Sequence, residues 1–285
     1  MIISLLKNFQ MTSNPAPPQF VGIAGLGTMG KALARALDSG ELPGLALGAV
    51  SVRYSESANR WMHTHLKRPV DCVEFDALAA SCDWVVECAP SGLLRAIAEP
   101  ALRRGRRLIV MSSGALLDAA DLVDLARTNG AQIIVPTGGL LGLDAVSAAG
   151  EGVIRSVTLV TRKPIAGLLG APLLVEKGID ITNIQEPMCL FRGNAKAARR
   201  GFPANVNVAV ALSLAGIGVE RTQVEVWADP TVTRNTHSIR VEADSASFSM
   251  TIENVPSENP KTGRIAALSL IACLRKAHAP LRVGT

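Results

Sequence analysis

Residues 20–30 read FVGIAGLGTMG, and this stretch predicts the fold of the N-terminal half of the chain. An apolar strand leads directly into three glycines spaced as Gly-x-Gly-x-x-Gly, and a segment with helical leucine spacing follows. Gly25 permits a tight turn, Gly27 lets a pyrophosphate approach the backbone, and Gly30 allows close packing of helix on strand. The alternative is a glycine turn without a ligand, but the strand-to-helix context favours dinucleotide binding. The predicted contacts of this motif are Gly25, Gly27, Thr28, Met29 and Gly30.

Strand-like and helix-like segments alternate over residues 20–137, and the strands are apolar on both faces. This pattern is typical of a parallel sheet with helices on both sides, so we expect an α/β, doubly wound Rossmann domain. The predicted strands are 20–25, 45–52, 70–75, 83–89, 107–111 and 131–136, and the predicted helices are 29–38, 57–65, 93–103 and 117–129.

Residues 138–260 have longer and more strictly alternating strands, which predict a C-terminal α+β domain on a mixed or antiparallel sheet. We interpret this region as the catalytic, substrate-binding and oligomerisation domain. The segment 261–285 holds a last helix, expected to pack back on the Rossmann domain, and residues 1–19 are expected to be a flexible extension in which Met11 is an alternative start. The predicted strands are 152–161, 183–191, 223–228, 235–243 and 246–254, and the predicted helices are 195–200, 205–215 and 262–277.

Further cofactor contacts are expected at the carboxyl ends of the strands, where doubly wound sheets bind ligands. Ala89 and Pro90 follow the fourth predicted strand, and Ser113 follows the fifth, although both loops read equally well as ordinary turns. After the second strand, Arg53 stands where an acidic residue would favour NAD, and no acidic residue precedes Glu56. Arg53 is therefore a candidate partner for the 2′-phosphate of NADP, or else it stacks on adenine or faces solvent.

The composition limits the classes of function. The chain of 285 residues is 48% hydrophobic and 19% charged, so it can bury a large core, and its 4% of aromatic residues disfavour single-stranded nucleic-acid binding. The net charge of +5 is scattered, which is typical of a solvated surface. The five cysteines form no Cys-x-x-Cys pair and no apolar run spans a membrane, so we expect a cytoplasmic protein with no membrane or nucleic-acid partner. No metal site is expected, since His63 and His65 would not share a helix face.

Polar residues in apolar surroundings mark the C-terminal half as the site of chemistry. Asn205 and Asn207 stand at the start of a predicted helix, where Asn205 is a reasonable N-cap. Asn207 lies inside the helix, so its amide either bonds to backbone or donates to the nicotinamide or the substrate. His237 shares a strand face with Ile239 and Val241, where a buried core histidine is the alternative to a catalytic one.

Five ordered motifs in this half resemble L-aspartate dehydrogenases, and with the glycine loop the resemblance covers essentially residues 20–280. Their length and order make the resemblance specific. The motifs are PTGGLLGLDA (136–145), NVNVA (205–209), VWADP (226–230), NTH (235–237) and ENVPSENPKT (253–262).

The resemblance implies an NAD- or NADP-dependent oxidation of L-aspartate to iminoaspartate that serves NAD biosynthesis, with reductive amination of oxaloacetate as the reverse. It places the family's active-site histidine on His237 and a cofactor-contacting asparagine on Asn207. A second cofactor contact falls in the loop with Gly139, at Leu141, where the family often has alanine, so only a backbone contact would survive that change. Family members are typically homodimers.

The implied oxidation of L-aspartate requires a group that accepts a proton and groups that bind the two substrate carboxylates. A neutral imidazole can take a proton from the substrate amine or activate water for imine hydrolysis. Two substrate carboxylates need cationic or amide donors, and Lys163, Arg192 and Lys261 are candidates. Two other functions remain open: a related two-domain reductase acting on a cyclic imine, a semialdehyde or homoserine, and a non-catalytic dinucleotide sensor.

Overall fold

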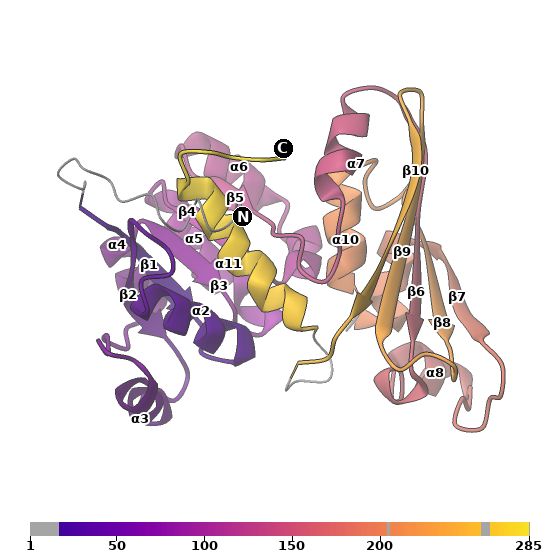
Figure 1. Ribbon diagram of the computed structural model, residues 1–285, viewed down its shortest axis with the longest axis horizontal. Helices are drawn as coiled ribbons and strands as arrows, with labels where there is room; N and C mark the ends of the chain where they lie inside the picture. The colour runs from indigo at the N-terminus through magenta and orange to yellow at the C-terminus, as the bar shows by residue number, and fades with distance from the viewer. Residues whose placement is uncertain (1–16, 204–205, 258–262, 285) are drawn as a thin grey trace.

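The computed structural model of the chain describes residues 17–203, 206–257 and 263–284, and it contains two five-stranded sheets (Figure 1). The first sheet is fully parallel, with the order β2-β1-β3-β4-β5. Its sequence-predicted doubly wound form is confirmed. Its strands are β1 Gln19–Ala24, β2 Leu45–Ser51, β3 Trp84–Glu87, β4 Arg107–Val110 and β5 Gln132–Ile134.

Helices cover both faces of the first sheet, because its strands carry buried apolar side chains on both sides. On one face, Val85 and Leu108 pack with α4, α5 and α6. On the other face, Ile23 and Val86 pack with α2 and with the last helix of the chain. The helical segments of this part are α2 Thr28–Asp38, α3 Ser55–His65, α4 Phe75–Ser81, η1 Ser91–Leu93, α5 Leu94–Arg103, η2 Ser113–Asp118 and α6 Asp121–Thr128.

The last helix, α11 (Arg264–His278), belongs to the core of the first sheet although it follows the second sheet in the chain. Leu270 and Leu274 are fully buried in the same cluster as Ile23. Helix α11 also contacts α2, and it lies across the N-terminal half in Figure 1. The core of the first sheet is thus assembled from both ends of the chain.

The second sheet has the order β10-β9-β6-β8-β7 and is mixed, because the central strand β6 pairs parallel with β8 and antiparallel with β9. Its strands are β6 Ile154–Lys163, β7 Met188–Asn194, β8 Gln223–Ala228, β9 Asn235–Ala243 and β10 Ser247–Asn254. Helices α7 and α10 lie on the face toward the first sheet (Figure 1). The helical segments are α7 Leu143–Gly150, η3 Ile165–Gly167, α8 Pro172–Lys177, α9 Ala195–Gly201 and α10 Val206–Ala215.

Several predicted elements differ from the structure. The strand predicted at 70–75 is wrong, since Cys72 forms only an isolated bridge with Val50 and Phe75 already begins α4. The helix predicted at 117–129 is divided into η2 and α6. The strand predicted at 183–191 begins only at Met188, and the sequence patterns did not predict α4, α7 or α8.

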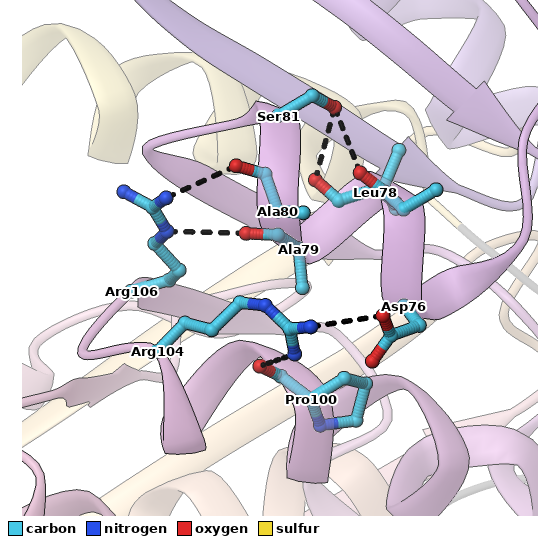
Figure 2. A network of polar contacts seen from close by, with 9 residues as sticks. Asp76, Leu78, Ala79, Ala80, Ser81, Pro100, Arg104 and Arg106 are labelled. Atoms are coloured by element: carbon cyan, nitrogen blue, oxygen red, sulfur yellow. Dashed lines mark hydrogen bonds and ion pairs between the residues drawn. The ribbon is translucent and has the colours of Figure 1, made fainter.

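Two arginines between α5 and β4 contact both ends of α4, and Figure 2 shows these contacts. Arg106 donates from Nε and Nη2 to the carbonyl oxygens of Ala79 and Ala80, both at 3.1 Å. Arg104 forms an ion pair of 2.8 Å with Asp76. Cationic groups at a helix C-terminus satisfy carbonyls that have no partner within the helix. This part of the basic sequence 103–107 therefore has a structural role.

Among the described residues, no helix has the length and apolar character needed to cross a bilayer.

Candidate functional site

The glycine loop between β1 and α2 combines two glycines required by packing with one that packing does not require. Gly25 has a φ of +100°, and a Cβ there would lie 2.6 Å from the carbonyl oxygen of Cys88. A Cβ on Gly30 would overlap the carbonyl oxygen of Gly25. Gly27 has an ordinary φ of −79°, and a Cβ there would meet no atom within 4 Å. The missing side chain at Gly27 therefore leaves open space above the loop rather than relieving a clash within the chain.

The start of α2 faces this open space with free donors. Gly27 is the N-cap, and no side chain caps the helix. The first amides of an α-helix have no partner within it, and here these include Thr28 and Met29. The helix has 11 residues, so its dipole adds a partial positive charge at the same point. The loop therefore fits the diphosphate of a dinucleotide.

Arg53 follows the end of β2 and is exposed, with its guanidinium 5.3 Å from the ring centroid of Tyr54. The ion pairs found among the described residues do not include Arg53. Its charge is therefore available to a ligand at the carboxyl edge of the sheet. This geometry is compatible with a 2′-phosphate contact and equally with stacking on adenine.

A buried glutamate connects the two loops that follow β3 and β4. Glu87 has no exposed surface, and its Oε1 accepts from the Ala89 amide at 3.0 Å and the Ser112 hydroxyl at 2.9 Å. Its Oε2 accepts from the amides of Met111 and Ser112 at 3.1 and 2.9 Å. Burial raises the pKa of Glu87, although these four hydrogen bonds oppose the rise. The carboxylate thus fixes the loop with Ala89 and Pro90 relative to the loop that leads to Ser113.

The second of these loops is bonded to helix α10. Ser113 donates from Oγ to the carbonyl oxygen of Asn207 at 2.8 Å. The amide of Gly114 donates to Asn207 Oδ1 at 3.1 Å, which leaves the Asn207 Nδ2 group as the free donor. Asn207 is exposed, so this donor is accessible. The structure therefore brings together two of the predicted cofactor contacts, Ser113 and Asn207.

The loop of residues 138–142 joins the same region to the end of β10. Asn254 donates from Nδ2 to the carbonyl oxygen of Gly139 at 3.0 Å, and a Cβ on Gly139 would lie 3.8 Å from the side chain of Val208 in α10. Leu141 is half-buried two residues further along. Gly139 therefore lies between α10, which carries Asn207, and the β9–β10 pair, which carries His237.

His237 lies on the inner face of the second sheet, near the beginning of β9. It is 6% exposed, and its Nδ1 lies 3.0 Å from Oγ1 of Thr161 on β6, its partner in the strand register. Asn254 pairs with Asn235, two residues before His237, so its Cα should lie about 7–8 Å from that of His237. Burial, with a smaller effect of the Lys163 charge, lowers the pKa of His237 to about 4. The imidazole is therefore neutral at physiological pH.

Lys163 is a buried cation on the same face. It ends β6 two residues after Thr161 and is 5% exposed. Burial lowers the pKa of its amine to about 8. A lysine is seldom this deeply buried without an ion-pair partner, yet no ion pair of its Nζ occurs among the described residues. Nζ is not one of the fully buried polar atoms without a hydrogen bond, of which Asn254 Oδ1 is the one found in the described part of the chain. Thr161, Lys163 and His237 form a polar cluster at the end of an otherwise apolar face, which distinguishes His237 from an ordinary core histidine.

The other predicted polar residues fall elsewhere. Arg192 pairs with Glu225 at 3.0 Å, and this pair lies on the opposite face of the sheet from His237. Of the candidate carboxylate ligands, the structure therefore does not bring Arg192 together with His237. Asn205 and Lys261 lie outside the described residues.

Sequence reasoning missed three residues of this region. Thr161 and Glu87 lie in strands that read as ordinary β-segments, and only their three-dimensional partners distinguish them. Asn254 belongs to one of the family-like motifs, but no role was expected for it. In the sequence, the one signal for Glu87 and Asn254 was that each is a polar residue at the end of a predicted strand, where burial would require a hydrogen-bond partner.

Comparison with known proteins covers both halves of the chain. The family model described as the C-terminal part of aspartate dehydrogenase matches residues 144–277. The model described as the NAD-binding domain of homoserine dehydrogenase matches residues 25–136.

Full-length relatives agree with this assignment. L-aspartate dehydrogenase from Bradyrhizobium diazoefficiens is 59% identical over 96% of this chain and 98% of its own length. L-aspartate dehydrogenase 3 from Bordetella bronchiseptica is 56% identical over 93% of this chain and 97% of its own. The crystal structure of aspartate dehydrogenase from Thermotoga maritima has the same fold, with a TM-score of 0.71 at 23% identity over 93% and 99% of the two chains. The chain therefore belongs to the aspartate dehydrogenase family.

Proposed function

We propose that this protein is an NAD(P)-dependent L-aspartate dehydrogenase, which oxidises L-aspartate to iminoaspartate and in reverse carries out the reductive amination of oxaloacetate. The observation that carries the proposal is the cluster of His237, Lys163 and Thr161, joined through Asn254 and Gly139 to the region of the cofactor loops. The relatives named L-aspartate dehydrogenase support the choice of substrate.

The cofactor would bind along the carboxyl edge of the first sheet. The glycine loop, with the amides of Thr28 and Met29, would hold the diphosphate, and Arg53 would reach the adenosine ribose. The nicotinamide, when bound, supplies the hydride acceptor of the reaction. We propose that the nicotinamide half of the cofactor would contact Ala89, Pro90, Ser113, Gly139, Leu141 and Asn207.

The residues of the second sheet would supply the proton chemistry. A C=N bond forms at the substrate only as the amine loses its protons, so an acid–base group must lie beside the substrate nitrogen. We assign His237 to this site, where its neutral imidazole would exchange a proton with the substrate or with the water that hydrolyses the imine. Lys163 supplies positive charge on the same face.

Several broader assignments accompany this function. We propose residues 20–137 as the dinucleotide-binding domain, 138–260 as the catalytic and oligomerisation domain, and 261–285 as a C-terminal segment associated with the first. We further propose a cytoplasmic homodimer that serves NAD biosynthesis, as the family resemblance implies. Light scattering coupled to size-exclusion chromatography would test the dimer, and a monomeric mass would contradict it.

The activity is tested by absorbance at 340 nm. Purified protein with NADH or NADPH, oxaloacetate and ammonia should oxidise the reduced cofactor, and L-aspartate with NAD or NADP should generate it. Omission of ammonia is the control, because reduction of the keto group alone would then continue. Binding of the reduced cofactor without any turnover would support a dinucleotide sensor instead. Turnover with homoserine or a semialdehyde, but not with aspartate, would indicate a related reductase.

A further inference from the structure

Lys163 is a second titratable residue on the sheet face that carries His237. Lys163 reaches the polar end of the inner sheet face from β6, and its side chain lies near η3: a Cβ on Gly167 would be 3.8 Å from Cδ of Lys163 and from Oδ1 of Asn235. Asn235 is two residues before His237 on the adjacent strand. The Lys163 side chain therefore lies at the end of the face at which Asn235 and Asn254 are paired, close enough to His237 for its charge to lower the pKa of the imidazole.

Among the described residues, the charged groups around Lys163 provide no counter-ion for its amine. On β9 the titratable neighbour is His237, which is neutral. After β8, the amide of Asp229 donates to the Lys163 carbonyl oxygen, but the Asp229 carboxylate is directed to Arg162 at 3.1 Å and to the Thr231 hydroxyl at 2.6 Å. Nothing on these packed elements holds Lys163 in its charged form. A desolvated lysine of this kind exchanges protons near neutral pH.

We propose that Lys163 is a second catalytic residue of the reaction, the base that takes a proton from the substrate ammonium group before hydride transfer. This inference rests on the proposed function. The neutral amine of Lys163 accepts one proton from the α-ammonium of L-aspartate, so that lysine becomes ammonium and the substrate becomes the free amine. The Cα–H bond then breaks with transfer of its electron pair to the oxidised nicotinamide, while the nitrogen lone pair forms the C=N bond. The products are protonated iminoaspartate and the reduced cofactor, and atoms and charge balance.

His237 is the weaker base of the two. Its pKa of about 4 means that the imidazole holds a proton poorly at neutral pH, whereas the Lys163 amine has a pKa of about 8. An efficient general base has a pKa near the working pH. The buried Thr161 hydroxyl has Nδ1 of His237 as its hydrogen-bond partner among the described side chains. When that hydroxyl donates to Nδ1, the proton of the neutral ring is on Nε2, and His237 donates a hydrogen bond beside the base. Of the two proton exchanges proposed for His237, the exchange with the substrate ammonium then passes to Lys163, and the exchange with the water that hydrolyses the imine stays with His237.

The substitution Lys163→Arg distinguishes two possible roles of Lys163, a general base and a ligand for a substrate carboxylate. Arginine keeps the positive charge and binds carboxylates well, but it cannot release its proton in this pH range. If Lys163 is the base, Lys163→Arg should lower kcat for aspartate oxidation by about 100-fold or more, with a much smaller change in KM. Lys177 is exposed on α8, so Lys177→Arg is the matched control and should retain wild-type kcat. Wild-type kcat in Lys163→Arg, with or without a raised KM, would overturn the proposal.

Two further measurements exclude a merely structural loss. In Lys163→Ala, added primary amines should restore part of kcat, and more basic amines of equal size should restore more; absence of this rescue would count against the base. The wild-type kcat for oxidation should rise with pH through about 8, because the amine must be neutral, and this rise should disappear in Lys163→Arg. Persistence of the same rise in the variant would assign it to another group.

A readout without turnover completes the test. Fluorescence titration should give both Lys163 variants the wild-type Kd for NADH, since Lys163 does not hold the cofactor. NMR titration of the imidazole should show a higher His237 pKa in Lys163→Met, because the neighbouring charge is removed. An unchanged His237 pKa would contradict the juxtaposition. Failure of the proposed function would instead appear as wild-type protein that does not oxidise aspartate, which is distinct from a Lys163→Arg variant as active as the wild type.

Discussion

Substitution of Glu87 by glutamine should destabilise the N-terminal half and weaken cofactor binding, although the side chains have the same shape. The carboxylate of Glu87 accepts four hydrogen bonds from the loops after β3 and β4, with two donors at each oxygen. A glutamine has one acceptor oxygen and one NH2 group. Whichever way the amide turns, its NH2 group therefore faces groups that donate to the carboxylate.

The two orientations differ in cost. With the NH2 group at the position of Oε2, the amides of Met111 and Ser112 both lose their acceptor. With the NH2 group at the position of Oε1, the Ser112 hydroxyl can rotate to accept, and only the Ala89 amide is left unpaired. One unpaired buried amide costs about 1–3 kcal/mol. We therefore expect Glu87→Gln to lower the free energy of unfolding by about 1–3 kcal/mol.

The assay is urea unfolding followed by circular dichroism, with NADH affinity measured by fluorescence. Glu56→Gln is the control, because Glu56 is exposed in the same half of the chain and should change stability little. Burial raises the pKa of Glu87, so the Glu87 carboxyl group binds its proton more tightly in the folded wild type than in the unfolded chain. This contribution to stability is complete below a pH of about 4.5 and is lost as pH rises through the folded-state pKa, so the deficit of the variant should be larger at low pH. Wild-type stability and NADH affinity in Glu87→Gln would refute the reasoning.

Three other substitutions test the site directly. His237→Ala should fold normally but lose about 100-fold or more in kcat by absorbance at 340 nm, and an unchanged kcat would remove its assigned role. Arg53→Asp should shift the ratio of kcat/KM values from NADP toward NAD, and a constant ratio would mean that Arg53 does not contact the ribose phosphate. Thr161→Val keeps the shape of the side chain but removes the partner of His237 Nδ1, so kcat should fall by about tenfold while the Kd for NADH stays constant. Wild-type kcat in that variant would show that the hydroxyl does not position the ring.

The parts of the fold that were predictable from sequence depend on local signals. The glycine loop fixes β1 and α2, and β8 and β9 have the predicted bounds because their alternation is uninterrupted. The failure at 70–75 arose because Val70, Cys72 and Val73 are residue types typical of a strand. In the structure this segment pairs with the edge strand β2 only through the isolated bridge of Cys72 to Val50. Helix α7 escaped prediction because its small residues show little contrast between faces.

The candidate site was predictable in its residue types but not in its connections. Asn207 was expected either to bond to backbone or to donate to a ligand, and the structure allows both at once, because Oδ1 accepts from Gly114 while Nδ2 remains free. The low pKa of His237 and the isolation of Lys163 depend on burial between strands that are distant in sequence. Arg192 was an equally good candidate by residue type, and only the parity of β7 places it on the other face.

The contribution of α11 to the first sheet has a consequence for biosynthesis. During translation, residues 20–137 leave the ribosome long before α11, so Leu270 and Leu274 are absent when the nascent parallel sheet first collapses. One apolar face of that sheet then stays incompletely covered until synthesis of the second half is finished. Such exposed surface binds chaperones and promotes aggregation, so an N-terminal fragment expressed without α11 should be far less soluble than one supplied with the helix in trans.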